Sequence, residues 1–167
     1  MRDATDLNRT GSYMSPLGPI SFTMRGEELI GLSFSRTVEA ADDATTERVR
    51  SELDAYFFQQ GKSFTIPFRF DGGTDFEHKV WRALSRIPYG ETRTYQDIAK
   101  AIGHDRAYRA VGQACRKNPI AIIIPCHRVI GKNRTMTGYR GSRTDTKKAL
   151  LAIEGVRIGF DDFTIRR

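Results

Sequence analysis

The chain has 167 residues, enough for one substantial domain or two small ones. No apolar stretch approaches the roughly 18 residues that a membrane-spanning helix needs, and the polar N-terminus lacks the apolar segment of a secretory signal. Two cysteines are too few for a disulfide framework, so both should be free thiols. We therefore predict a cytoplasmic protein that does not associate with membranes.

The net charge of +7 belongs to one part of the chain. Residues 1–73 hold 8 Lys and Arg against 11 Asp and Glu, whereas residues 74–167 hold 19 against 9. A basic part beside an acidic one favours a polyanionic partner, through neutralisation of phosphates and release of counterions. Charge alone leaves open a basic surface that is merely solvated.

Residues 1–73 are predicted to form a small α+β domain. Alternating apolar residues predict three strands, and apolar residues at helical spacing predict one helix. The strands cover 20–24, 30–34 and 64–70, and the helix covers 49–57. Asp71-Gly72-Gly73 is the best candidate for a domain boundary. Because this part holds no catalytic cluster of His, Cys or carboxylates, we expect it to be scaffold.

Beyond Gly73 the spacing of apolar residues becomes helical. Thr74 and Glu77 have the spacing of a capping box ahead of the first helix. The four predicted helices cover 76–87, 94–102, 106–117 and 144–154. Residues 74–167 are therefore predicted to be a second, mainly helical domain.

The second and third of these helices, joined by a short turn at Gly103, resemble a helix-turn-helix. Small residues mark the inner face of the later helix: Ala107, Ala110, Val111, Ala114 and Cys115. Polar residues mark its outer face: Arg106, Arg109, Gln113 and Arg116. An ordinary helical hairpin with a basic face remains the alternative, although the charge of this part favours DNA.

Pro125-Cys126-His127-Arg128 is the segment that most strongly indicates chemistry. The apolar run 120–124 predicts a buried strand that ends at Pro125 and delivers a thiol and an imidazole into a turn. A thiolate is the nucleophilic form of cysteine, and a neighbouring base or positive charge promotes it. We predict Cys126 as a nucleophile and His127 as its base, directly or through water, with Glu154 a candidate to orient His127.

A metal site is the competing interpretation of this segment. The candidate ligands are Cys115, Cys126, His127 and His104, but no CxxC or HxxxH spacing is present. We therefore predict no metal, and we expect Cys115 to be inert core. In the basic segment 131–143, Tyr139 stands between glycines and is placed to stack on a planar substrate, with an ordinary surface loop as the alternative.

Together these motifs resemble the O6-alkylguanine-DNA alkyltransferases, the methylated-DNA–protein-cysteine methyltransferases. The resemblance covers nearly the whole chain, is densest from 76 to 155, and is specific around Cys126. The matching segments are Ser15–Gly18, Ile87–Thr92, Thr94-Tyr95, Arg109–Gly112, Asn118-Pro119, Ile124–Ile130 and Leu150–Gly155.

The resemblance implies an α+β fold, with a small N-terminal antiparallel sheet and a helix (ribonuclease-H-like), followed by a mainly helical C-terminal domain that contains the helix-turn-helix. It implies irreversible, single-turnover transfer of a methyl or alkyl group from O6-alkylguanine in DNA to Cys126 after base flipping, without a cofactor. O4-alkylthymine stays open as a second substrate. The expected partner is double-stranded DNA, bound through its minor groove by a monomer.

The resemblance also assigns site residues position by position. Cys126 is the acceptor, His127 the base acting through water, Glu154 its orienter, and Asn118 the brace of the segment that bears the thiol. The substrate-binding positions are Tyr139, Tyr95, Val129 and Arg140. The DNA-binding positions are Arg109, Tyr95, Ala110, Gly112, Arg106, Gln113 and Arg116, of which Arg109 fills the gap left in the base stack.

Some features depart from the family pattern. Arg140, Ser142 and Arg143 occupy loop positions where members usually carry small residues, which leaves the preferred adduct size open. The Cys and His ligands that hold a structural zinc in some relatives are absent. Two other functions stay open: a DNA-binding regulator with an unreactive thiol, and a thiol hydrolase that turns over repeatedly.

Overall fold

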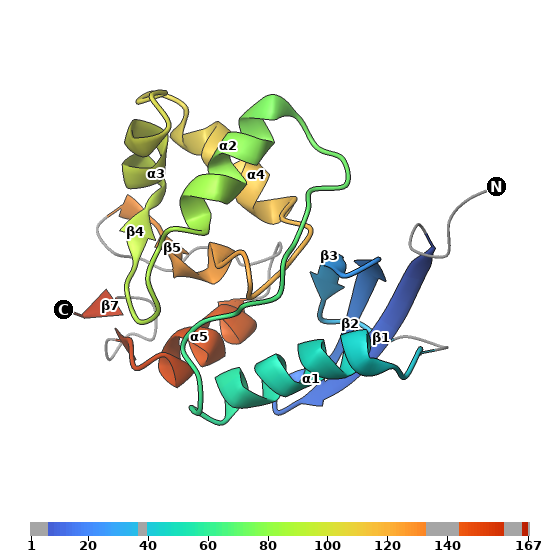
Figure 1. The fold of residues 1–167 in the computed structure, drawn as a ribbon. Coiled ribbons are helices and arrows are strands. Elements are labelled where there is room, and N and C mark those ends of the chain that lie inside the picture. The colour runs from blue at the N-terminus through green and yellow to red at the C-terminus, as the bar shows by residue number, and fades with distance from the viewer. Residues whose placement is uncertain (1–6, 37–39, 133–143, 159–164, 167) are drawn as a thin grey trace. The chain divides into compact units, whose positions relative to one another are not determined.

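A computed structural model describes residues 7–36, 40–132, 144–158 and 165–166 of the chain. The chain divides into two units, Met1–Gly72 with Pro119–Ala121, and Gly73–Asn118 with Ile122–Arg167. The fold class is α+β, as predicted: a small antiparallel sheet with one helix comes first, and a mainly helical part follows (Figure 1).

The sheet of the first unit consists of β1 (Asn8–Ser15), β2 (Gly18–Arg25) and β3 (Glu28–Ser33) in antiparallel order. Along β2, Ile20, Phe22 and Met24 are buried and the residues between them are partly exposed, as in a sheet with one face in the core. Strand β1 was not predicted, because its mostly polar residues show little apolar alternation.

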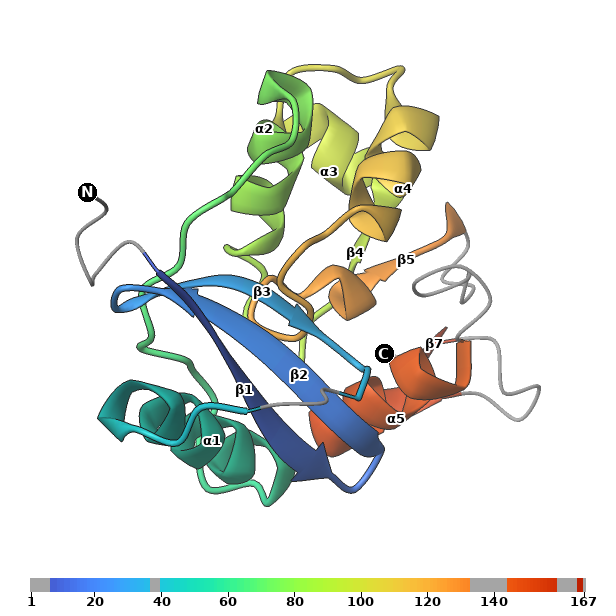
Figure 2. The ribbon, with the colours of Figure 1, turned by 90° about the vertical axis from the view of Figure 1, so that its right-hand side faces the viewer.

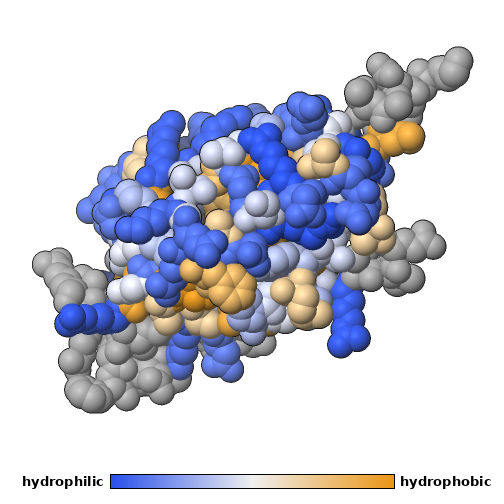
Figure 3. Space-filling model, turned by 60° about the horizontal axis from the view of Figure 1, so that its bottom comes forward, coloured by the Kyte–Doolittle hydropathy of each residue, from blue (hydrophilic) through white to orange (hydrophobic). Residues whose placement is uncertain are grey.

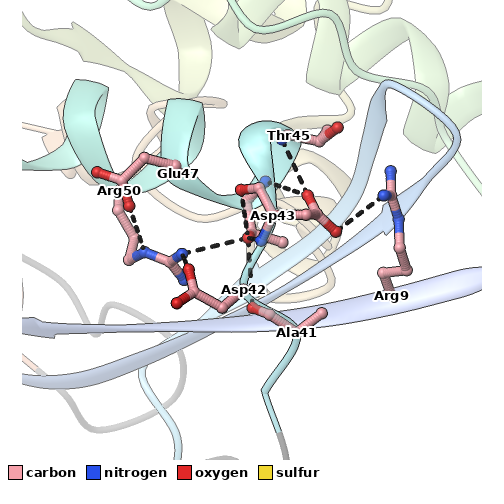
Figure 4. Close-up of polar contacts among 8 residues, drawn as sticks. Arg9, Ala41, Asp42, Asp43, Thr45, Glu47 and Arg50 are labelled. Carbon is pink, nitrogen blue, oxygen red and sulfur yellow. Dashed lines mark hydrogen bonds and ion pairs between the residues drawn. The ribbon is translucent and has the colours of Figure 1, made fainter.

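Helix α1 (Ala44–Phe57) begins at a capping box and is tied to β1 there. The Asp43 side chain accepts hydrogen bonds from the backbone N–H groups of Thr45 and Thr46, at 2.9 and 3.0 Å. The same carboxylate pairs with Arg9 of β1 at 2.9 Å (Figure 4). The buried face of the helix consists of Thr46, Val49, Leu53, Tyr56 and Phe57.

The strand predicted at 64–70 is wrong in extent. Only Phe68 forms a bridge, to Leu29 of β3, and the rest of the segment is irregular. Pro67 explains this, because proline has no N–H to donate and restricts the backbone of the residue before it. Its carbonyl still accepts from Leu29, at 2.9 Å.

The described residues of the second unit form four α-helices: α2 (Asp75–Leu84), α3 (Tyr95–Ala101), α4 (Tyr108–Arg116) and α5 (Thr144–Ile153). Thr74 and Thr94 each begin a helix with a complete capping box, at the positions predicted. The Trp81 indole N–H of α2 donates to the Ala114 carbonyl of α4 at 2.9 Å, which fixes these two helices to each other. Figure 2 draws α2, α3 and α4 close together, and each of the three contacts the other two.

Short strands complete the second unit. Strand β4 (Arg93–Thr94) pairs in parallel with β5 (Val129–Ile130), which places the segment after Cys126 beside the start of α3. Strands β6 (Arg157–Ile158) and β7 (Ile165–Arg166) pair antiparallel.

The predicted buried strand at 120–124 is also wrong. Ile120 forms a single bridge to Leu32, and residues 121–123 form a turn in which Ile122 has a φ of 70°. Ile120, Ala121, Ile122 and Ile124 are nevertheless buried. The apolar run therefore reports burial correctly, but burial by itself does not distinguish a strand from a buried turn.

Among the described residues, every helix is too short or too polar to cross a lipid bilayer. The face drawn in Figure 3 is mostly hydrophilic, with smaller hydrophobic areas between the polar side chains.

Candidate active site

Cys126 opens the short 3₁₀ helix η2 (Cys126–Arg128), directly after Pro125. Its backbone N–H donates to the Ile124 carbonyl at 2.8 Å. The residue is only 4% exposed. The thiol therefore lies in a confined place, where a reactant must be brought to it.

Asn118 braces the segment that bears this thiol. Its side-chain Nδ2 donates to the Ile124 carbonyl at 2.7 Å and to Cys126 Sγ at 3.1 Å. The first bond satisfies a buried carbonyl, which would be costly to leave without a partner. The second bond strengthens as negative charge develops on sulfur, because hydrogen bonds to charged acceptors are the stronger ones.

Glu154, at the end of α5, accepts hydrogen bonds from three directions. Its Oε2 lies 2.6 Å from His127 Nε2, and both side chains are fully buried. Arg128 donates to both carboxylate oxygens, from Nε at 2.7 Å and from Nη2 at 3.1 Å. The Gly90 backbone N–H donates to Oε1 at 3.0 Å. These bonds hold the end of α5 against η2 and the loop before β4.

The charge states of this cluster follow from burial and from its partners. Burial is the largest cause that lowers the pKa of His127; Glu154 opposes the shift, and the charges of Arg128 and Lys147 add to it. Burial alone would raise the pKa of Glu154, but its hydrogen bonds with His127 and Arg128 and the charge of Arg128 outweigh burial and lower it to about 2. At neutral pH an ionised Glu154 therefore faces a neutral His127.

This charge state fixes the tautomer of the imidazole. An ionised carboxylate can only accept hydrogen bonds, so Nε2 of His127 must carry the hydrogen that it shares with Glu154. Nδ1 then carries the lone pair that can take a proton. The ring is arranged as a general base with an orienting carboxylate behind it.

Arg128 and Lys147 are site residues that were not expected from the sequence. Lys147 of α5 is 1% exposed, donates from Nζ to the Val129 carbonyl, and lies 5.9 Å from the centre of the Tyr95 ring. Burial is the main cause that lowers its pKa, to about 8, against the opposing charges of Cys126 and Cys115. Lys147 thus places a positive charge close to the thiol.

The spacing of residues along α5 could have indicated that Lys147 is buried. Lys147, Leu150, Leu151 and Glu154 are buried and follow the i, i+3, i+4, i+7 pattern of a single helix face. A lysine on the same face as two core leucines and a candidate catalytic carboxylate indicates an inward orientation.

Helix α4 presents the predicted polar face to solvent. Arg109, Gln113 and Arg116 of α4 are exposed, as is Arg106 in the turn before the helix, and Val111, Ala114 and Cys115 are buried. Ala110 is a correction: it was predicted on the inner face but is exposed, because it lies three residues before Gln113 and so shares the outer face of the helix. Gly112 is half-buried, and a Cβ there would lie 3.9 Å from the ring of Tyr95. Gly112 therefore faces α3.

The remaining predicted residues are placed as follows. Val129 is fully buried in β5, and its carbonyl is the acceptor of Lys147. Tyr139 and Arg140 lie outside the described residues. Cys115 lies on the buried face of α4, and burial raises the pKa of its thiol. Within the described ranges, no three His, Cys, Asp or Glu side chains are grouped as a metal site requires.

Comparison with protein families identifies the chain. Residues 8–70 match the ribonuclease-like domain of 6-O-methylguanine DNA methyltransferase, and residues 75–156 match the DNA binding domain of that protein. The chain belongs to the 6-O-methylguanine DNA methyltransferase family. It is 42% identical over 153 residues to the constitutive methylated-DNA–protein-cysteine methyltransferase of Bacillus subtilis, covering 85% of this chain and 92% of that protein.

Other proteins named as methyltransferases are similar to this chain over most of its length. The methylated-DNA–protein-cysteine methyltransferase of Methanosarcina acetivorans is 45% identical, covering 86% of this chain and 96% of that protein. A crystal structure of the Mycobacterium tuberculosis protein OGT in complex with DNA is 43% identical, with a TM-score of 0.79 over 87% of this chain and 91% of that one. A crystal structure of the Mycobacterium tuberculosis O6-methylguanine methyltransferase has a TM-score of 0.80 at 41% identity, covering 89% of this chain and 93% of that one.

The buried carboxylate of this methyltransferase predicts its acid sensitivity. A lowered pKa means that Glu154 stabilises the native state above its ordinary pKa of 4.5 and loses that contribution as the pH falls towards 2. We expect this group to account for about 3 kcal/mol of the unfolding free energy lost over that interval. Glu154→Gln should flatten the acid profile and cost about 3–5 kcal/mol at neutral pH, because it leaves Arg128 buried without a counter-ion.

Urea denaturation at successive pH values, followed by circular dichroism, measures both effects. Glu27→Gln, at an exposed carboxylate, is the matched control and should keep the wild-type profile. An acid profile that Glu154→Gln leaves unchanged would contradict the assigned charge state.

Proposed function

We propose that this chain repairs O6-alkylguanine in DNA by transferring the alkyl group to Sγ of Cys126, once per molecule. As a family member it is a methylated-DNA–protein-cysteine methyltransferase, and DNA is its partner. The observation that carries the residue-level proposal is a confined thiol, held by Asn118, next to an imidazole that Glu154 orients.

The proposed reaction is a direct displacement. Nδ1 of His127 takes the thiol proton, directly or through one water, and Glu154 stabilises the imidazolium that forms. The thiolate attacks the alkyl carbon, a carbon–sulfur bond forms, and the bond from that carbon to guanine O6 breaks. The departing guanine keeps the electron pair and takes up a proton. Because the thioether that remains on Cys126 has no route back to a thiol, the protein acts once.

The confined thiol explains why the damaged base must leave the duplex. Cys126 is 4% exposed and His127 is fully buried, so neither side chain can reach an atom inside a base stack. Rotating the nucleotide out of the helix costs a few kcal/mol, less for a damaged base that pairs poorly. We propose that Tyr95, Val129, Tyr139 and Arg140 surround the flipped base.

We propose that the exposed face of α4 docks in the minor groove, with the protein bound as a monomer. Arg106, Gln113 and Arg116 would contact the DNA backbone. The small residues Ala110 and Gly112 would allow the helix to approach the groove closely. Arg109 would fill the gap left by the flipped base. The exposure of Arg109 supports this role. Its guanidinium lies 6.0 Å from the centre of the Tyr108 ring, on the same exposed part of the helix. In this scheme residues 74–167 carry the chemistry and residues 1–73 serve as scaffold.

Lys147 is proposed to assist the transfer electrostatically. Its buried ammonium attracts the negative charge that develops on Cys126 and passes to the leaving guanine, and this attraction is large where water is excluded.

The acceptor can be tested against the second cysteine. Incubation with a duplex containing O6-methylguanine should add the mass of one methyl group to the peptide that holds Cys126, with a stoichiometry near one. Cys126→Ala should abolish transfer and retain DNA binding, whereas Cys115→Ala should keep transfer, because Cys115 is core. Mass spectrometry of the digested protein decides this, and transfer that survives in Cys126→Ala would refute the assignment.

The role of Lys147 predicts a pH signature. Lys147→Met should slow single-turnover transfer at least about tenfold, because it removes the positive charge near the thiol. The ratio of wild-type to variant rates should shrink as the pH rises through about 8, where Lys147 loses its proton. Lys148→Met, at the neighbouring half-buried lysine, should leave the rate near that of wild type. A ratio independent of pH would count against a charge effect.

Arg109 should matter only when a base has to be flipped. We expect Arg109→Ala to slow transfer from duplex DNA by about tenfold or more, because it loses help with a flipping step that costs a few kcal/mol. Transfer from a free O6-alkylguanine base should change little. Arg36→Ala removes an exposed arginine of the first unit and serves as the control. Equal losses on both substrates would remove the proposed role.

A further inference from the structure

A basic hollow lies between α2 and β4–α3 of the second unit, separate from the thiol site. Its volume is about 450 Å³. Lys79 and Arg82 of α2 and Arg86 of the turn after it line one side, and Arg93 of β4 lines the other. Apolar side chains of Ala83, Ile87, Ile98, Ala101 and Ile102 complete the lining.

The charge of this basic hollow is strongly unbalanced. Asp97 is the single acidic residue in its lining, and its carboxylate already caps α3 by accepting from the Thr94 N–H at 2.9 Å. Arg93 also reaches Glu91, 3.3 Å away at the exposed rim. Lys79, Arg82 and Arg86 are exposed. Several cations within about one Debye length of each other repel, and a polyanion relieves that repulsion.

The cations beside α2 suit a nucleic-acid backbone. Lys79 and Arg82 lie on one face of α2 at i, i+3 spacing, and Arg86 lies in the turn that follows the helix. Each DNA strand carries one phosphate per roughly 3.4 Å of rise. Three cations that line one hollow can therefore contact two or three successive phosphates.

The basic hollow does not belong to the face of α4 that is proposed to grip the lesion. The hollow is lined by α2, the turn after it, β4 and α3. The exposed polar residues of α4 are absent from its lining. Two basic surfaces with no residue in common can serve two segments of DNA.

We propose that the basic hollow binds the sugar–phosphate backbone of a second DNA segment while α4 holds the segment that carries the lesion. The inference rests on the proposed function, since it takes α4 as the lesion-binding element. A second contact of this kind lets the protein pass from one DNA segment to another without fully dissociating, and it adds phosphate contacts whose strength falls as salt is added.

A two-duplex capture experiment tests this inference. A biotinylated duplex with O6-methylguanine is fixed to streptavidin and loaded with Cys126→Ser protein, so that the lesion persists; a fluorescent, unmodified duplex is then added. Fluorescence is retained only if one assembly holds both duplexes, because exchange releases the protein from the support. We expect retention that declines with salt.

Matched variants assign the capture to the basic hollow. Lys79→Gln, Arg82→Gln and Arg86→Gln combined should reduce retained fluorescence at least about fivefold, with unchanged loading on the first duplex, since two to three phosphate contacts are lost. Arg36→Gln, Lys62→Gln and Arg69→Gln combined remove the same charge from the first unit and should retain fluorescence like the parent protein. Absence of capture by the parent, equal capture by the hollow variant, or loss of first-duplex loading in that variant would overturn the inference.

Methyl transfer measured in parallel separates the two proposals. With Cys126 present, both triple variants should transfer at the parent rate from the methylated duplex. If Cys126 is not methylated and the second duplex is still captured through the hollow, the proposed function fails and the second contact stands.

Discussion

The buried carboxylate of Glu154 is the constraint on which the site depends. A carboxylate removed from water must find partners, and Glu154 finds them on His127, Arg128 and the Gly90 backbone. These partners come from segments far apart in the sequence. Arg128 also donates to the Ile87 carbonyl at 2.6 Å, and the Tyr89 hydroxyl donates to the Ile153 carbonyl at 3.1 Å. The position of the thiol is thereby fixed by the requirement to compensate one charge.

The two cationic side chains near Cys126 and His127 have different partners. The hydrogen bonds of His127 and Arg128 lower the pKa of Glu154, so the carboxylate is ionised while His127 is neutral. Lys147 donates to the Val129 carbonyl and lies near the Tyr95 ring. In the proposed transfer, these charges would favour the negative charge that passes from sulfur to the leaving base.

Local signals in the sequence predicted the helical part well. The capping boxes at Thr74 and Thr94 mark helix starts because they depend on residues only three positions apart. Long-range pairing was less accessible. Strand β1 has a mostly polar sequence and becomes a strand by pairing with β2. In the segment 64–70, Pro67 limits the pairing to one bridge, between Phe68 and Leu29. The apolar run 120–124 signals burial but not its backbone shape. The turn in this run is held by the Asn118 side chain, which donates a hydrogen bond to the Ile124 carbonyl.

In the candidate site too, some features could be predicted from the local sequence, whereas others depend on long-range packing. Cys126, His127 and Glu154 could be named from residue types, and the structure places the last two 2.6 Å apart. The bidentate bond of Arg128 and the inward position of Lys147 depend on how α5 packs, which residue type alone does not reveal. Both are long cations of the kind usually found at the surface; here Glu154 is the counter-ion of Arg128, and the Val129 carbonyl accepts a hydrogen bond from Lys147.

The side-chain ¹⁵N and ¹H resonances of His127, assigned by their loss in His127→Gln, report which ring nitrogen carries the hydrogen. At neutral pH we expect a neutral imidazole with its hydrogen on Nε2 and a strongly downfield proton shared with Glu154. An imidazolium, or a neutral ring with its hydrogen on Nδ1, would contradict it.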